Sequence, residues 1–124
     1  MRYIMLIYSQ ENDEATAEER HAVAAAHSAL MTEARQRGVF CAAEPLQSSV
    51  TATTLRMQNG TAMVTDGPFA ETKEQLAGYY ILDCQNLDEA LEWAARIPTA
   101  CAGGAGSIEV RPLREMPRGA LVNG

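Results

Sequence analysis

The residues best suited to move a proton in this chain are His27 and Asp66. An imidazole changes its charge near neutral pH, so His27 could take a proton from a bound molecule and return it. A carboxylate beside it would fix the tautomer of the ring and stabilise its charged form. The two residues are far apart in sequence, so the elements that carry them decide whether they meet.

His27 belongs to the stretch "TAEERHAVAAAHSALMTEARQRG", which predicts a helix over 16–38. Thr16 and Glu19 predict a capping box, and Gly38 supplies the stop. At about 100° per residue, His27 falls on the apolar face and His21 on the opposite face. A histidine on an apolar face is usually a satisfied core residue, so this interpretation stays open beside the catalytic one. The apolar residues of that face are Val23, Ala26, Leu30 and Ala34.

Asp66 lies in "VTDGPFAETKEQ". An aspartate before Gly-Pro is a common turn residue, because its side chain can bond the backbone two residues on. The same turn could aim the carboxylate at His27 or at a ligand, so both roles stay open. Gly67 and Pro68 would set the backbone of the turn. Phe69 is expected to plug into the core.

Four further side chains could line a ligand site: Tyr8, Glu44, Tyr79 and Arg111. A buried tyrosine needs a partner for its hydroxyl, and a cleft on the sheet face away from the helices would provide one. Arg111 alternates away from Ile108 and Val110, so it could bind an anionic group there. A salt bridge to Glu109 is the alternative for this arginine.

Metal and cofactor chemistry are not expected. His21 and His27 lie on opposite helix faces and cannot share an ion, and no carboxylate stands at ligand spacing from His27 along the helix. The glycine-rich "AGGAG" opens no helix, so it is interpreted as a connection and not as a phosphate loop.

The apolar pattern predicts the order strand, helix, strand, hairpin, strand, helix, strand. Asn59-Gly60 is a strong hairpin signal because both residues tolerate positive φ. This turn pairs Leu55 with Val64 and brings Thr53 opposite Asp66. The predicted strands are 2–8, 39–47, 51–58, 61–65, 78–84 and 107–113, and the second helix, 87–97, is capped by Asn86.

Without the hairpin, this order is βαββαβ, an α+β arrangement of ferredoxin-like type. Two helices cover only one face of such a sheet, yet strands 2–8 and 78–84 are apolar on both alternations. A second copy of the chain is the simplest cover for the other face. The sequence therefore predicts a homodimer with a cleft for a small molecule between sheet and partner.

The composition restricts the class of protein. The chain has 124 residues, which fits one domain, and its net charge of −6 argues against a nucleic-acid partner. No apolar stretch is long enough to predict a membrane span. The three cysteines, an odd number without metal-like spacing, predict a reduced cytoplasmic protein in which they mostly pack as small apolar groups.

Four segments carry a resemblance to a known family: "YIMLIY", "TDGPFAETKEQLAGYYILDC", "LDEALEWAARIP" and "GSIEVRPL". They resemble the YCII-related family, in its branch named for the Asp-Gly-Pro-Phe motif, over residues 1–113. The tail 114–124 has no counterpart in this resemblance. The resemblance implies a ferredoxin-like domain that dimerises into an α+β barrel.

The resemblance also implies a His–Asp pair in a cleft. The family's histidine stands eleven residues before the glycine that ends the first helix, which is the spacing of His27 and Gly38. Asp66 of the motif is the matching choice for the acid. One relative is a dehydrochlorinase acting on a chlorinated aromatic diol, and members of this branch are associated with sigma factors.

Two functions follow as hypotheses. In the first, His27 and Asp66 form a proton-transfer pair that acts on a small aromatic or cyclic substrate without a cofactor. In the second, the same cleft holds a ligand without catalysis, or the dimer docks on a protein such as a sigma factor.

Overall fold

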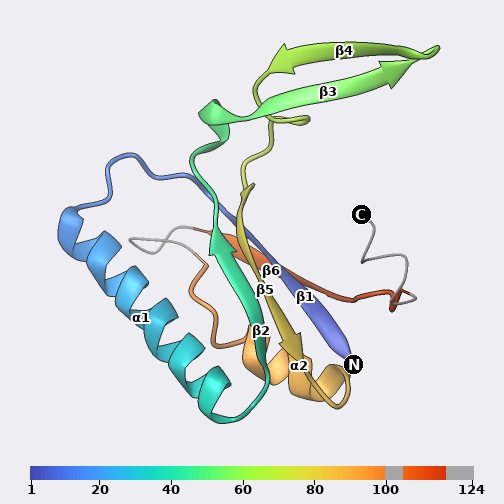
Figure 1. The fold of residues 1–124 in the computed structure, drawn as a ribbon. Coiled ribbons are helices and arrows are strands. Elements are labelled where there is room, and N and C mark those ends of the chain that lie inside the picture. Colours follow the sequence, from blue (N-terminus) through green and yellow to red (C-terminus); the bar gives the residue numbers. More distant parts are fainter. Residues whose placement is uncertain (100–104, 117–124) are drawn as a thin grey trace.

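The computed structural model describes residues 1–99 and 105–116 of the chain (Figure 1). Strands and helices alternate much as the apolar pattern predicts. The elements are β1 (Arg2–Ser9), α1 (Ala17–Gln36), β2 (Phe40–Pro45), the short 3-10 helix η1 (Ser49–Thr51), β3 (Thr53–Gln58), β4 (Thr61–Asp66), β5 (Gln75–Asp83), α2 (Leu87–Ala94) and β6 (Gly106–Pro112).

Four strands form one sheet in the order β2-β5-β1-β6, and all neighbouring pairs are antiparallel. The connection through α1 therefore spans β5, and the connection through α2 spans β1. This is an α+β fold with two helices and an antiparallel sheet, compatible with the ferredoxin-like type. Within the described ranges, no helix is long and apolar enough to cross a membrane.

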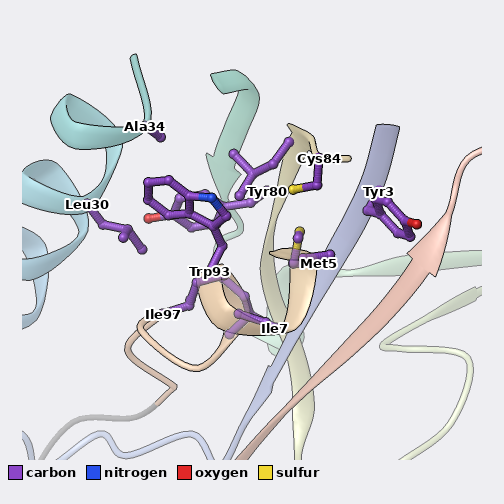
Figure 2. Close-up of a cluster of buried hydrophobic side chains, with 12 residues drawn as sticks. Tyr3, Met5, Ile7, Leu30, Ala34, Tyr80, Cys84, Trp93 and Ile97 are labelled. Carbon is purple, nitrogen blue, oxygen red and sulfur yellow. The ribbon is translucent and has the colours of Figure 1, made fainter. Parts of the chain in front are cut away.

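The core lies between the helices and one face of the sheet (Figure 2). Alternate residues of a strand point to one face, and Met5 of β1 stands opposite Tyr80 of β5. Met5 is 0% exposed and Leu82 is 1% exposed. Helix α1 contributes Leu30 and Ala34 to this cluster, and α2 contributes Ala90, Trp93 and Ala94.

The second face of the sheet carries the other alternation. Ile4 pairs with Ile81, and Leu6 pairs with Tyr79, on the face away from the helices. These four side chains are only partly buried. The double apolar character of these strands is thus divided between a face covered by helices and a face that stays partly open.

The helix ends follow the predicted caps, whereas the helix faces differ in part. Thr16 Oγ1 accepts from the Glu19 amide at 3.1 Å, and the Glu19 carboxylate accepts from the Thr16 amide at 3.1 Å. The Asn86 side chain caps α2 by accepting from the Glu89 amide at 2.9 Å. Ala26 was expected on the packed face of α1 but is exposed, because its small side chain falls at the edge of the stripe that contacts the sheet.

Strands β3 and β4 form a separate two-stranded sheet. Asn59 and Gly60 between them adopt φ of 51° and 78°, as a type I′ turn requires. Leu55 stands opposite Val64, and Thr53 stands opposite Asp66. Figure 1 shows this pair of strands extending away from the four-stranded sheet.

Phe69 corrects one prediction, because it does not plug into the core. Its ring is 75% exposed, and the Arg56 guanidinium lies 5.9 Å from the ring centre. Arg56 also donates to the Phe69 carbonyl oxygen at 3.0 Å. The Asp-Gly-Pro turn directs the following residue along the hairpin and away from the sheet, so Phe69 has no core within reach.

The cysteines divide by position. Cys84, directly after β5, is buried, as expected of a small apolar group, whereas Cys41 on the edge strand β2 is exposed. The third cysteine, Cys101, and most of the predicted tail, residues 117–124, lie outside the described residues.

Candidate functional site

A cavity of about 580 Å³ lies between α1 and the sheet, beside the edge strand β2 and its neighbour β5. Its interior is mainly apolar, with walls from Ile7 of β1, Val23 and Met31 of α1, and Ala43 of β2. This cavity is on the helix side of the sheet. The cleft predicted from the sequence lies on the opposite side and requires a second chain, so it stays a prediction.

His27 and Tyr80 supply the central polar contact of this cavity. His27 Nδ1 lies 2.7 Å from the Tyr80 hydroxyl oxygen, and the two rings are stacked with their centroids 5.8 Å apart. Both residues line the cavity. Helix α1 brings His27 over β5, because His27 lies one turn before the buried Leu30 and the partly buried Met31, which pack on the core.

Burial sets the protonation state of both partners. Burial lowers the pKa of His27 below its usual value, because a low-dielectric surrounding disfavours the charged imidazolium. Burial likewise raises the pKa of Tyr80, which is 2% exposed. Near neutral pH the pair is therefore a neutral imidazole and a neutral phenol sharing one hydrogen bond.

Two tautomers satisfy that bond, and they offer different groups to a ligand. If Nδ1 carries the proton, it donates to the tyrosine oxygen, and Nε2 is left as a base. If Tyr80 donates to Nδ1, then Nε2 carries the proton and becomes a donor. The pair therefore offers either a base or a hydrogen-bond donor at Nε2. A proton taken up there would make His27 a charged imidazolium, which an anionic form of the ligand would have to balance.

Tyr80 was not singled out as a site residue from the sequence, although the signal was present. A buried tyrosine hydroxyl requires a partner, and Tyr80 shares its alternation with the buried Leu82. His27 is on the inward face of the predicted first helix. Matching those two polar groups across the helix–sheet layer would have found the pair.

The other predicted site residues fall in different places. Glu44 and Tyr79 line the His27 cavity. Tyr8 and Arg111 are not among its walls. Arg111 lies opposite Ile4 on the face away from the helices and forms an exposed ion pair with Glu109. Glu44 stands opposite Tyr79 in the β2–β5 pair, so both side chains belong to the face away from the helices, and only their strands border the cavity. Of the predicted site residues, His27 alone directs its side chain to this cavity.

Asp66 lines a second, more open hollow, at the base of the hairpin. Its neighbours there include Gly67, Glu71 and Lys73. The turn is held in place because the Gly67 amide donates to the Ala52 carbonyl oxygen at 2.7 Å. Within one chain, Asp66 and His27 therefore line different hollows. These hollows share three wall residues, Gln10, Glu11 and Gln75.

Glu11 joins the two loops that border both hollows. Its carboxylate accepts from the Ser48 hydroxyl at 2.8 Å and from the Ser49 amide at 3.0 Å. Hydrogen bonds from these serines lower the pKa of Glu11, because they stabilise the carboxylate form. The loop after β1 and the loop after β2 are thus tied together at the mouth of the cavity.

Among residues 1–99 and 105–116, no group of three or more His, Cys, Asp or Glu side chains is arranged to hold a metal ion. The cavity is lined by the His–Tyr pair and apolar side chains, with the Glu11 carboxylate at its mouth.

The geometry defines a small α+β domain of ferredoxin-like type with one interior polar pair facing a cavity. The chain belongs to the YCII-related domain family, whose model matches residues 1–117. It is also 41% identical over 115 residues to an uncharacterised protein of Rhizobium meliloti (strain 1021). The aligned region covers 91% of this chain and 92% of the relative.

Proposed function

We propose that this protein binds a small, largely apolar ring compound in the His27 cavity and transfers a proton to or from it through His27 and Tyr80. The observation that carries the proposal is the 2.7 Å contact between His27 Nδ1 and the Tyr80 hydroxyl in the wall of a cavity of about 580 Å³. A cavity of this size suits one small molecule.

The chemistry of the walls supports a ligand with one hydroxyl or carbonyl group. Such a group would form a hydrogen bond with the His27–Tyr80 pair, while the ring would contact Val23, Met31 and Ala43. Glu11 and Asp13 also line the cavity, against the single cation Arg20 among its walls. This balance favours neutral or cationic ligands over anionic ones, because a buried anion would face like charges.

Asp66 enters this proposal as a candidate second acid. It would assist only if it reached the ligand across the walls that the two hollows share, Gln10, Glu11 and Gln75. The partner of His27 supported by geometry within one chain is Tyr80. Substituting Asp66 and Tyr80 separately therefore distinguishes a His–Asp pair from a His–Tyr pair.

A homodimer is part of the same proposal. It is supported by the partly exposed apolar side chains Ile4, Leu6, Tyr79 and Ile81 on the sheet face away from the helices. Contiguous apolar surface of this kind marks protein interaction sites. A cytoplasmic location fits this proposal, since the exposed Cys41 would stay reduced there.

Binding of 4-nitrophenol, a small ring with one hydroxyl, tests the site by titration calorimetry at mildly acidic pH, where that hydroxyl is protonated and the ligand is neutral. We expect His27→Ala and Tyr80→Phe each to weaken binding about tenfold, the loss of one buried hydrogen bond. His21→Ala is the matched control, because His21 is exposed on the same helix. Equal affinity for wild type and both cavity variants would refute the site.

Catalysis is tested separately from binding. Chloride release from a chlorinated aromatic diol, the substrate class implied by the family resemblance, is measured for wild type and for His27→Ala, Tyr80→Phe and Asp66→Asn. A large loss in the first two variants alone supports the His–Tyr pair. A large loss in Asp66→Asn supports the His–Asp pair.

Non-catalytic ligand binding is the second candidate. It is favoured by the mutual satisfaction of His27 and Tyr80, which also describes a structural hydrogen bond. Calorimetric binding that depends on His27, without turnover of any compound that binds, would select this function.

A further inference from the structure

The β3–β4 hairpin has one apolar face and one polar face. Residues directly opposite each other in an antiparallel pair share a face. Leu55 and Val64 therefore lie beside Met57 and Ala62, which form the next apolar pair along the strands. The other face carries Thr54, Arg56, Gln58, Thr61, Met63 and Thr65. The alternation is that of a strand pair with one face intended for burial.

The apolar face of this hairpin is nevertheless open in the single chain. Leu55 is 58% exposed, and Met57 and Val64 are each 63% exposed. A two-stranded hairpin is marginally stable alone in water and requires packing on one face. The sequence alternates as if a surface were present, which is the pattern of a face that packs against a partner.

The position of the hairpin indicates where that partner lies. Figure 1 shows the hairpin extending from the end of the sheet to the side opposite α1. The face of the sheet away from the helices carries Ile4, Leu6, Tyr79 and Ile81, all partly exposed. A second chain seated against that face would lie beside the hairpin of the first. The two open apolar surfaces would then belong to one continuous interface.

A second copy of this chain suits both open surfaces. In a symmetric pair, each chain would present its hairpin face and its open sheet face to the same surfaces of the other chain. Permanent homodimers bury roughly 1,000 Å² or more from each chain. The hairpin and the open sheet face would therefore be used together.

We propose that the β3–β4 hairpin is an intersubunit arm, whose face of Leu55, Met57, Ala62 and Val64 packs against a second copy of this chain. The inference rests on the proposed homodimer and adds a second contact region to it. A symmetric dimer would use the arm twice, once from each chain.

Sedimentation equilibrium of the full chain tests the arm. We expect the double variant Leu55→Ser/Val64→Ser to raise the dimer dissociation constant roughly tenfold or more, because four apolar contacts are lost per dimer. Met63→Ser is the matched control. Met63 is also exposed on the hairpin, at 47%, but on the polar face, so its dissociation constant should stay within about twofold of wild type.

Folding of each variant is followed by circular dichroism and by the fluorescence of Trp93, which is 2% exposed in the core. The hairpin lies outside that core, so these signals should not change. A third variant, Leu6→Glu, reports on the open sheet face.

Three results would overturn the arm. An unchanged dissociation constant for the double variant, with Leu6→Glu disrupting the dimer, would leave a dimer formed by the sheets alone. Equal weakening by Met63→Ser would remove the role of the apolar face. A wild type that is monomeric at every concentration would overturn both the arm and the homodimer. Binding of 4-nitrophenol in the same samples reports on the cavity independently.

Discussion

Leu82 in the four-stranded sheet and Leu55 in the hairpin have similar local structure. Each lies in an antiparallel strand, and the residues on either side of it point to the opposite face. Leu82 is 1% exposed and Leu55 is 58% exposed. The difference arises because α1 and α2 cover one face of the sheet, whereas no element of the described chain lies over the apolar face of the hairpin. Alternation therefore determines which residues share a face, and packing determines which face is buried.

The largest expected effect separates these two leucines. Leu82→Ala should lower the free energy of unfolding by about 2–5 kcal/mol, because it leaves a cavity in the core. Leu55→Ala should lower it by less than about 0.5 kcal/mol at protein concentrations where the chain is monomeric. Urea unfolding monitored by Trp93 fluorescence measures both. Similar losses in the two variants would break the comparison.

Two glycines sharpen the same contrast. A Cβ on Gly78 of β5 would lie 2.7 Å from the Glu44 carbonyl oxygen, so Gly78→Ala should cost about 1–3 kcal/mol by forcing β2 and β5 apart. Gly60 has open space around it but a φ of 78°, so Gly60→Ala should cost about 1 kcal/mol of local strain. Global thermal unfolding should detect the first change strongly, and hydrogen exchange of β3 and β4 should detect the second.

The pH dependence of stability should come from the four-stranded sheet and its helices, and not from the hairpin, because it acts through His27. Burial lowers the pKa of this histidine in the folded state. As pH falls below about 6.5, the unfolded chain binds a proton that the folded chain does not, so the free energy of unfolding decreases. The decrease should stop once the pH is below the pKa of the folded state.

Urea unfolding at pH 7.5 and pH 5 measures this effect, which should be smaller than that of Gly78→Ala. His27→Gln should remove this part of the acid sensitivity, whereas Tyr80→Phe should retain it, because the cause is burial and not the hydrogen bond. A Tyr80→Phe variant as insensitive as His27→Gln would contradict burial as the cause.

The smallest expected effect concerns the open face of the sheet. Arg111→Ala should change the free energy of unfolding by less than about 0.5 kcal/mol, since the ion pair with Glu109 is exposed. Thermal unfolding at low and high protein concentration checks this. A loss that appears only at high concentration would show that a second chain covers this face.

Much of the fold could be predicted because its signals are local. The capping box of Thr16 and Glu19, the cap at Asn86 and the turn at Asn59-Gly60 each depend on residues within a few positions of one another. The candidate site was less predictable. His27 could be chosen from its helix face, but its contact with Tyr80 joins residues 53 positions apart.

Phe69 and Ala26 show the same limit in the other direction. Each is apolar and stands where a pattern favours burial, but each is exposed. A side chain is buried only where another part of the chain packs against it. The direction of the turn before Phe69 and the width of the packed face of α1 depend on many residues, so a single residue type does not predict either.

The sequence by itself determined the order of the elements, their caps and turns, and the alternation that divides each strand into two faces, since all of these follow from short-range sterics and hydrogen bonding. Only the tertiary structure decided which face the helices cover, which tyrosine meets His27, and that Asp66 lies at a separate hollow. Those outcomes depend on the angle and distance between elements, and these are fixed by the packing of the whole core.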